Sequence, residues 1–179
     1  MRQFMQIVEN ADPILYHGTS APITEPFRPF SHFGTRAAAL HRAAVVVRQQ
    51  GRTWADGVWS NDLDAPVYLY PVTVHMTKPL RLRDLTGKHS GHGPADIARL
   101  LPAREFSNDE RRAYDYDMLG SIIISHGYDG IVYENSHEDA GSDSTIILRS
   151  EQATASAPEI MTLRDALVEL GVPETNFHE

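Results

Sequence analysis

The residues with the clearest chemistry stand at positions 16–19, where the chain reads Tyr-His-Gly-Thr. A short apolar lead precedes them and polar, proline-containing sequence follows, a pattern typical of a buried strand that ends at a cleft. His17 then brings an imidazole to the rim, and Gly18, which lacks a Cβ, lets a ligand approach the main chain. The N–H and C=O of Gly18 can pair with a flat amide. Because a histidine at a strand end can also serve only to pack the core, this motif alone does not decide the function.

A second motif of similar composition, His-Phe-Gly-Thr, stands at positions 32–35. It leads into an alanine-rich stretch over 36–50, which predicts a helix that ends at Gly51. Thr35 is placed as the N-cap of this helix, because a threonine hydroxyl can accept a hydrogen bond from an otherwise unpaired N–H of the first turn. Both motifs therefore stand where an element ends or begins.

Four carboxylates stand in the segment 134–143, namely Glu134, Glu138, Asp139 and Asp143. The flanking patterns predict a turn into a strand over 128–133 and a strand over 144–148, so we expect an acidic loop between two strands. A fixed anion can stabilise positive charge that develops in a transition state. The same composition is typical of a solvated surface loop, and that interpretation stays open.

His89 and His92 form a His-x-x-His pair in a glycine-rich segment. Such a pair can bind a metal ion, but no third ligand stands beside it, so we expect a loop and no metal. The glycines of this segment follow no strand of a βαβ unit and do not predict a dinucleotide fingerprint.

The composition of the 179-residue chain is that of an ordinary globular domain, with 41% hydrophobic and 22% charged residues. A formal net charge of −8 argues against an extended nucleic-acid surface but allows a local nucleotide site. The absence of cysteine excludes disulfides, thiolate zinc sites and a cysteine nucleophile. No stretch reaches about 18 consecutive apolar residues and no signal peptide is recognisable, so we expect a soluble, cytoplasmic protein without a membrane partner.

The other patterns predict the elements that hold these residues. The β-branched and aromatic run over 67–76 predicts a strand, in which Pro71 favours an edge position or a bulge. We expect one domain over 1–179, with a core over about 14–152 and a C-terminal helix over about 160–171. Further expected elements are helices over 94–101 and 109–125, the latter with Ser107 as N-cap, a loop over 51–64 and a link over 153–158.

Taken in order, the motifs resemble the ADP-ribosyltransferase superfamily, in particular its small bacterial and phage members with a His-Gly-Ser or His-Gly-Thr first motif. The resemblance covers about 14–152 and is carried by segments 16–19, 32–39, 68–72, 78–80 and 127–135. It implies an α+β fold with a split, strongly bent mixed β-sheet and flanking helices. Members of this superfamily hold NAD+ in the cleft between the two half-sheets.

The resemblance also implies roles for single residues. His17 would hydrogen-bond a ribose hydroxyl of the adenosine half of NAD+, and Gly18 would clamp the nicotinamide carboxamide with its backbone, supported by Thr19. Thr35 would lie under the nicotinamide ribose. The other residues of the two motifs would line the NAD+ pocket, and these are Tyr16, His32, Phe33 and Gly34. Many members have a tyrosine where this chain has His32 or Phe33.

The third motif of the superfamily supplies an acid that accepts a hydrogen bond from the ribose 2′-OH and stabilises positive charge as nicotinamide leaves. Three acids of this chain compete for that catalytic role. Glu138 stands in an Asn-x-x-Glu pattern that a glycine-containing loop and a strand follow, Asp143 directly precedes the last strand, and Glu134 closes the strand before it. We rank them in that order.

The resemblance thus implies a mono-ADP-ribosyltransferase that transfers ADP-ribose from NAD+ to a macromolecular acceptor, a protein rather than a nucleic acid, without a metal. By analogy it would be a toxin, an effector or a phage modifier of host factors. One alternative is NAD+ hydrolysis or RNA 2′-phosphotransfer, a second a non-catalytic binding or inhibitor module. Candidate phosphate ligands for the phosphotransferase are Arg28, Arg36, Arg42 and Arg81. The sequence predicts neither the acceptor nor the oligomeric state.

Overall fold

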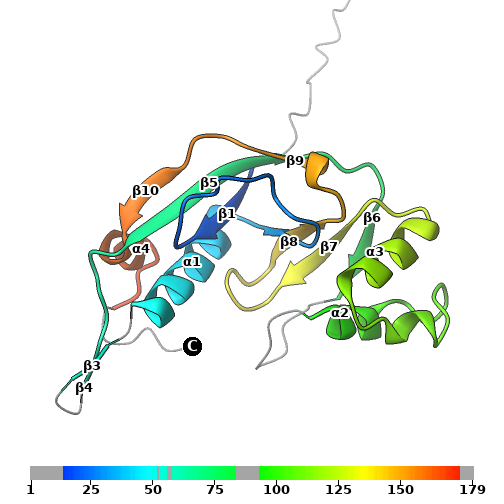
Figure 1. The fold of residues 1–179 in the computed structure, drawn as a ribbon, viewed down its shortest axis with the longest axis horizontal. Coiled ribbons are helices and arrows are strands. Elements are labelled where there is room, and N and C mark those ends of the chain that lie inside the picture. The colour runs from blue at the N-terminus through cyan, green and yellow to red at the C-terminus, as the bar shows by residue number, and fades with distance from the viewer. Residues whose placement is uncertain (1–13, 52, 56–57, 84–92, 174–179) are drawn as a thin grey trace, which may run out of the picture.

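The computed structural model describes residues 14–51, 53–55, 58–83 and 93–173, and the His89–His92 pair lies outside them. Within these residues the chain is an α+β fold with four α-helices and two four-stranded sheets (Figure 1). The first sheet is antiparallel, with the order β1-β5-β10 and with β9 also paired to β5. The second sheet is mixed, with the order β2-β8-β7-β6, because β6 runs parallel to β7. The eight strands are β1 (Leu15–Thr19), β2 (His32–Phe33), β5 (Pro66–Val74), β6 (Pro79–Leu82), β7 (Gly130–Asn135), β8 (Ser142–Ile147), β9 (Ala153–Ala155) and β10 (Glu159–Thr162).

The two sheets are joined at their inner strands, β1 and β2. Tyr16 and Gly34 exchange two backbone hydrogen bonds, from Tyr16 N–H to the Gly34 carbonyl at 2.8 Å and from Gly34 N–H to the Tyr16 carbonyl at 3.1 Å. This isolated antiparallel bridge places the motif at 16–19 directly beside the motif at 32–35. The two motifs, which the sequence separates, therefore meet at the junction of the sheets.

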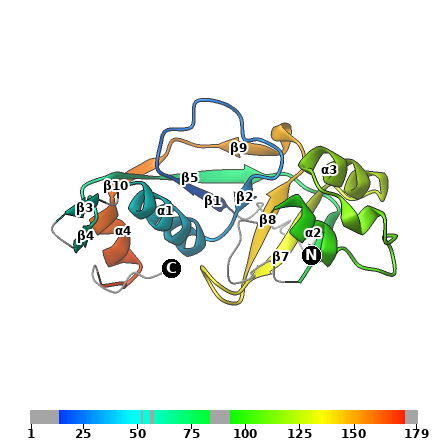
Figure 2. The same cartoon turned by 60° about the horizontal axis from the view of Figure 1, so that its bottom comes forward.

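Helices cover the two sheets separately. The helices α1 (Arg36–Gln50) and α4 (Leu163–Glu169) share an apolar cluster with the first sheet, which includes Leu40, Val67 and Leu163. The helices α2 (Pro94–Leu100) and α3 (Tyr116–Ser125) pack on the second sheet, around Ile97, Leu119 and Ile131. Figure 2 shows these two groups of helices at opposite ends of the molecule. None of the described helices is long and apolar enough to cross a membrane.

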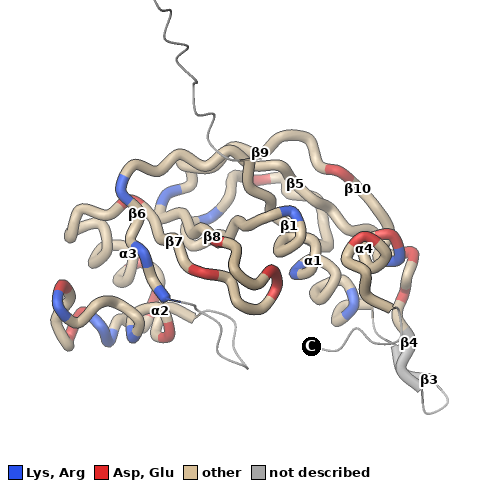
Figure 3. The backbone as a smooth tube through the Cα atoms, turned by 180° about the vertical axis from the view of Figure 1, so that it is seen from behind, with Lys and Arg blue, Asp and Glu red and all other residues tan. Residues whose placement is uncertain are grey.

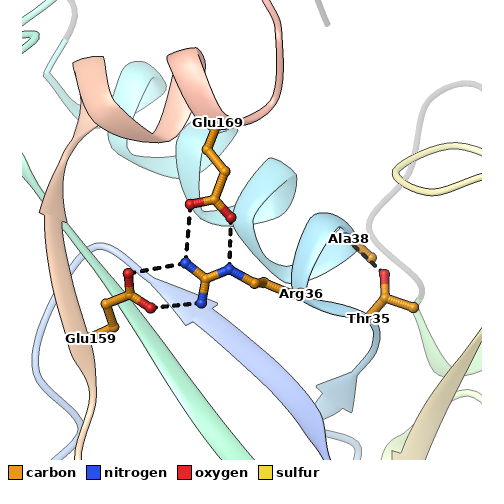
Figure 4. Close-up of polar contacts among 5 residues, drawn as sticks. All are labelled: Thr35, Arg36, Ala38, Glu159 and Glu169. Carbon is orange, nitrogen blue, oxygen red and sulfur yellow. Dashed lines mark hydrogen bonds and ion pairs between the residues drawn. The ribbon is translucent and has the colours of Figure 1, made fainter.

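The start of α1 is held by two interactions that its sequence predicts only in part. Thr35 is the N-cap, as expected, and its hydroxyl accepts a hydrogen bond from Ala38 N–H at 3.2 Å. The guanidinium of Arg36 forms bidentate pairs with Glu159 of β10 and Glu169 of α4, at 2.6–3.0 Å (Figure 4). These hydrogen bonds lower the pKa of Glu159 below its ordinary value. The C-terminal strand and helix are thus tied to the core of the fold.

Gly18 allows β1 to lie unusually close to α1. A Cβ built on Gly18 would stand 2.0 Å from the Ala39 carbonyl oxygen and 2.8 Å from the Ala43 Cβ. Neither atom belongs to a flexible side-chain end, so a larger residue would push the helix off the sheet. The glycine is therefore required by packing, in addition to any contact with a ligand.

We expect Gly18→Ala to lower the free energy of unfolding by about 3 kcal/mol, the upper part of the usual range for overpacking. Chemical denaturation measures this value. The control is Gly93→Ala, because a Cβ on Gly93 would meet only the Asp96 carboxylate at an ordinary 3.6 Å. Equal stability of the Gly18→Ala and wild-type proteins would contradict the close contact between β1 and α1.

Of the two expectations for Pro71, the edge position is wrong, because β5 is the central strand of the first sheet. The pairing is irregular at this point, as a bulge would make it, because residues 156–158 stand opposite residues 70–71 between the Leu69–Glu159 and Val72–Ala155 pairs. The proline is tolerated there for a local reason. Its carbonyl accepts a hydrogen bond from Ser156 N–H at 2.8 Å, between the segments paired with β9 and β10. Since N and C=O of one residue point to the same side of an antiparallel strand, the missing N–H faces this interruption of the neighbouring strand.

The predicted helix over 109–125 is divided into two. A 3₁₀ turn, η1 (Glu110–Arg112), comes first, and α3 begins only at Tyr116. Asp115 caps α3, with its carboxylate accepting a hydrogen bond from Met118 N–H at 2.7 Å, whereas Ser107 caps the turn. The sequence contains two N-cap signals, and the second one starts a new helix.

Three predicted loops or links contain strands. The loop over 51–64 holds the hairpin β3 (Thr53–Ala55) and β4 (Val58–Ser60). The link over 153–158 holds β9, after the 3₁₀ turn η2 (Ser150–Gln152). The acidic loop shrinks to residues 136–141, because β7 and β8 extend to Asn135 and from Ser142. Cross-strand pairing stabilises these short segments, and local sequence does not report it.

Candidate functional site

A pocket of about 400 Å³ lies between α1 with the first sheet and the inner strands of the second sheet. Its walls come from β1, the segment 30–34, α1, the first residue of α3, β7, β8 and the loop between β7 and β8. It contains all four residues of the motif at 16–19 and three of the motif at 32–35. Segments more than a hundred residues apart in the sequence thus meet in one cavity.

His17 lies in this pocket in one definite tautomer. Its Nδ1 is 2.8 Å from the carbonyl oxygen of His32, and since a carbonyl can only accept, Nδ1 carries the proton. Burial lowers the pKa of His17 below its ordinary value, with the His32 hydrogen bond opposing that effect in part. The ring is therefore neutral at pH 7, and Nε2 is an acceptor. Phe27 and Phe33 hold the ring in place, with centroids 5.1 and 5.7 Å away.

The backbone of Gly18 is directed toward the free side of β1. Tyr16 turns both its N–H and its C=O toward Gly34, and groups two residues apart along a strand point to the same side. The N–H and C=O of Gly18 therefore point away from β5, to the side where the chain has left β2 and entered α1. No backbone hydrogen bond of Gly18 to that side is found among the described residues.

The second motif contributes three residues to the pocket and one to its frame. His32 Nδ1 and the Tyr133 hydroxyl share a hydrogen bond of 2.9 Å, Phe33 is only 1% exposed, and Gly34 lies at the strand junction. Thr35 is absent from the pocket lining, and its hydroxyl is engaged twice, as the N-cap and as a donor to the Asp139 carboxylate at 2.5 Å. In this structure Thr35 connects α1 to the loop between β7 and β8.

The three candidate acids differ in whether their side chains reach the pocket. Glu134 and Asp143 face each other across β7 and β8, one residue away from Tyr133 and Ser144, which line the pocket. Because side chains alternate along a strand, both acids point to the opposite face of the sheet. Asp143 there forms a bidentate ion pair with Arg81, at 2.5 and 2.7 Å. Of the three, Glu138 is the one that lines the pocket.

The four candidate arginines differ in their partners and in whether they line the pocket. Arg36 and Arg81 are held by carboxylates, and Arg28 lies 3.9 Å from Glu25. Arg42, on α1, lines the pocket, and neither an ion pair nor a hydrogen bond of its side chain is found within the described part of the chain. It is placed to meet an anionic ligand.

Several lining residues do not stand in any motif. Phe30 and Tyr116 both line the pocket and pack with their rings tilted by 37° and centroids 4.6 Å apart, and Phe30 has a left-handed backbone with φ of 67°. A non-glycine residue in that region is uncommon and marks a tightly determined turn. Tyr133 and Ser144 could have been found from strand alternation around the acidic segment. No local sequence pattern marks Tyr116 as a pocket residue. It lines the pocket because α3 begins at this residue, after the break that divides the expected helix.

Comparisons with protein-family models, curated proteins and solved structures find no match to this chain.

Proposed function

We propose that the protein is an NAD+-dependent mono-ADP-ribosyltransferase. The observation that carries the proposal is the meeting of His17, Gly18 and Glu138 in one pocket between two sheets. The resemblance of the separate motifs assigns these three residues to ribose, carboxamide and transition-state charge. Their common location in a cavity of about 400 Å³, the size range of ligand sites, supports that assignment.

Each of the three residues has the chemistry that its proposed role requires. The neutral His17 offers Nε2 as an acceptor for a ribose hydroxyl. Gly18 offers one donor and one acceptor on the free side of β1, which is the pair that a carboxamide needs. Glu138 supplies an anion beside the sugar, where positive charge develops as the bond to nicotinamide breaks.

In the proposed reaction the C1′–N bond of NAD+ breaks, and its electron pair leaves with the nicotinamide nitrogen, which becomes neutral. The sugar passes through an oxocarbenium-like state that a nearby carboxylate stabilises. A nucleophilic atom of a protein side chain then forms a bond to C1′ and releases its proton to water. A toxin, an effector or a phage protein that modifies host factors would use this reaction in the cytoplasm of a target cell.

Incubation of the protein with adenine-labelled NAD+ and a cell lysate tests the proposal. Transfer predicts a labelled protein band together with free nicotinamide. Nicotinamide with free labelled ADP-ribose and no labelled macromolecule would identify NAD+ hydrolysis instead. Absence of both nicotinamide release and NAD+ binding would identify a non-catalytic module and contradict the proposal.

Arg42→Ala should raise the KM for NAD+ about tenfold and leave kcat within about threefold, because an exposed charged contact to a diphosphate is worth roughly 1.4 kcal/mol. Steady-state nicotinamide release measures both constants. The variant should also bind ADP-ribose more weakly but nicotinamide riboside, which has no phosphate, equally well. Arg48→Ala, on the same helix and outside the pocket lining, is the control. An unchanged KM for Arg42→Ala would place the diphosphate elsewhere.

A further inference from the structure

The loop over 136–141, which carries Glu138, is hydrogen-bonded to one buried side-chain amide, that of Asn135. Asn135, the last residue of β7, is 1% exposed, and its Oδ1 accepts hydrogen bonds from three successive backbone N–H groups. These are His137 at 3.1 Å, Glu138 at 2.9 Å and Asp139 at 3.5 Å. The backbone N–H of Glu138 is therefore hydrogen-bonded directly to the Asn135 side chain.

The orientation of the Asn135 side chain is itself determined. Because the three N–H groups can only donate, they require the amide oxygen on their side. The amide nitrogen then points to Ser144, where Nδ2 donates to Oγ at 3.1 Å. The Asn135 carbonyl also accepts a hydrogen bond from Gly141 N–H at 3.1 Å, which closes the loop. The side-chain oxygen and the backbone carbonyl of Asn135 thus both bond to the loop, and Nδ2 fixes the orientation of the amide.

The far side of the loop is anchored to α1. Asp139 accepts the hydrogen bond from Thr35, and the ring of His137 lies 6.0 Å from the ring of His41. Figure 3 shows acidic positions of this loop beside α1. The loop therefore crosses from the second sheet to the helix of the first, and Glu138 lies between its two anchors, where it lines the pocket.

We propose that Asn135 is the positioning residue of Glu138: its amide holds the loop in the conformation that directs the Glu138 carboxylate into the pocket. This inference rests on the proposed function, because it gives Asn135 its importance through the acid. A buried acceptor for three N–H groups cannot be replaced by water at no cost, since the site is closed by Ser144 and the strands. Loss of the amide would free the loop and misplace the carboxylate, and displacements of about 1 Å can cost 100-fold in rate.

A double-mutant cycle tests the proposal, with Asn135→Ala, Glu138→Gln and the double variant. Asn135 itself lines the pocket, but its Oδ1 and Nδ2 are both hydrogen-bonded to protein groups. We therefore expect Asn135→Ala to lower kcat about 10–100-fold with KM for NAD+ within about threefold, because His17, Gly18 and Arg42 stay in place. The kcat of the double variant should match that of Glu138→Gln within about threefold. Once the carboxylate has been removed, its position no longer affects the rate. A multiplicative effect of the two changes on kcat, or a full-rate Asn135→Ala, would overturn the proposal.

Two further variants separate positioning from stability. Asn135→Asp keeps an acceptor for the three N–H groups and can accept from the Ser144 hydroxyl, so its kcat should lie within about fivefold of wild type. Ile123→Val removes one methyl group from the fully buried core of the second sheet, so it should lower stability and leave kcat unchanged. If Ile123→Val lowers kcat as much as Asn135→Ala does, the role of Asn135 is only structural and the proposal fails.

Hydrogen exchange of the loop gives a measurement that does not depend on activity. The amides of His137 and Glu138 should exchange at least about tenfold faster in Asn135→Ala than in wild type or Ile123→Val. If the exchange rates of these two amides are unchanged in Asn135→Ala, Asn135 does not hold the loop and the proposal fails. A wild-type protein without nicotinamide release would instead overturn the proposed function, and a fully active Glu138→Gln would overturn the role of Glu138 and with it the catalytic consequence of this inference.

Discussion

Replacement of Glu138 by Gln is expected to lower kcat for nicotinamide release about 100-fold to 1000-fold, with little change in the KM for NAD+. The substitution keeps the size of the side chain and removes its negative charge. Loss of one well-placed electrostatic contact to a transition state costs roughly 3–4 kcal/mol, which corresponds to that factor. The charge matters in the transition state, where the sugar becomes positive, and matters less in the ground state. Steady-state rates of nicotinamide release measure the effect.

The matched controls are Asp143→Asn and Glu134→Gln, which make the same change of charge on the opposite face of the second sheet. We expect both to retain kcat within about twofold, since exposed charges outside a site contribute little. Asp143→Asn also breaks the ion pair with Arg81, and this pair is largely exposed. A large loss of activity in Asp143→Asn with a normal Glu138→Gln would show that the acid of the pocket has been misassigned.

His17→Asn is expected to lower kcat/KM for NAD+ at least about 100-fold in a protein that still folds. The asparagine amide nitrogen occupies nearly the position of Nδ1 and can still donate to the His32 carbonyl. It has no group at the position of Nε2, so the proposed acceptor for the ribose hydroxyl is lost. His17→Ala should lose activity as well, but it also removes the donor to the His32 carbonyl. Both substitutions remove the half-buried ring that Phe27 and Phe33 contact.

Thermal unfolding and isothermal titration with NAD+ separate the two effects. His17→Asn should keep a cooperative transition near that of wild type and show no measurable binding at concentrations that saturate wild type. His75→Asn, at an exposed position of the same residue type, is the control. Normal NAD+ binding by His17→Asn would remove His17 from the ligand site.

The protonation of His17 adds a dependence on pH. Because burial lowers its pKa from 6.5, NAD+ binding should be constant from pH 8 to 6.5 and fall only at lower pH, when Nε2 takes a proton. Between pH 6.5 and the lower pKa of the folded state, the unfolded chain binds a proton at His17 that the folded protein does not bind. The free energy of unfolding therefore decreases as the pH falls through this range. His17→Asn should lack this contribution to the pH dependence of stability.

Much of the secondary structure could be predicted from the sequence, because its signals are local. The helix over 36–50 begins and ends where Thr35 and Gly51 indicate, and the strand that carries His17 lies where its apolar lead indicates. The prediction failed where pairing between distant strands or a second N-cap decided the outcome. Examples are the hairpin within 51–64, the central position of β5 and the division of 109–125 at Asp115.

The site follows the same division. The motifs and their resemblance to a known superfamily proposed His17 and Gly18 and limited the candidate acid to three positions, because a motif records residue types and their spacing. The resemblance ranks Glu138 before Asp143 and Glu134, but which of the three side chains reaches the pocket depends on where β7 ends and β8 begins. Pairing of these strands out to Asn135 and Ser142 turns Glu134 and Asp143 to the far face and leaves Glu138 in the loop.

The sequence by itself therefore determined which residues of this protein are candidates for binding and catalysis and which short elements carry them. The tertiary structure alone decided which of them meet, because the Tyr16–Gly34 bridge and the Thr35–Asp139 hydrogen bond each join separate segments through folding. It also gave Gly18 a second requirement, the contact with Ala39. A contact between residues a hundred positions apart depends on the packing of whole sheets and helices, and no local pattern encodes it.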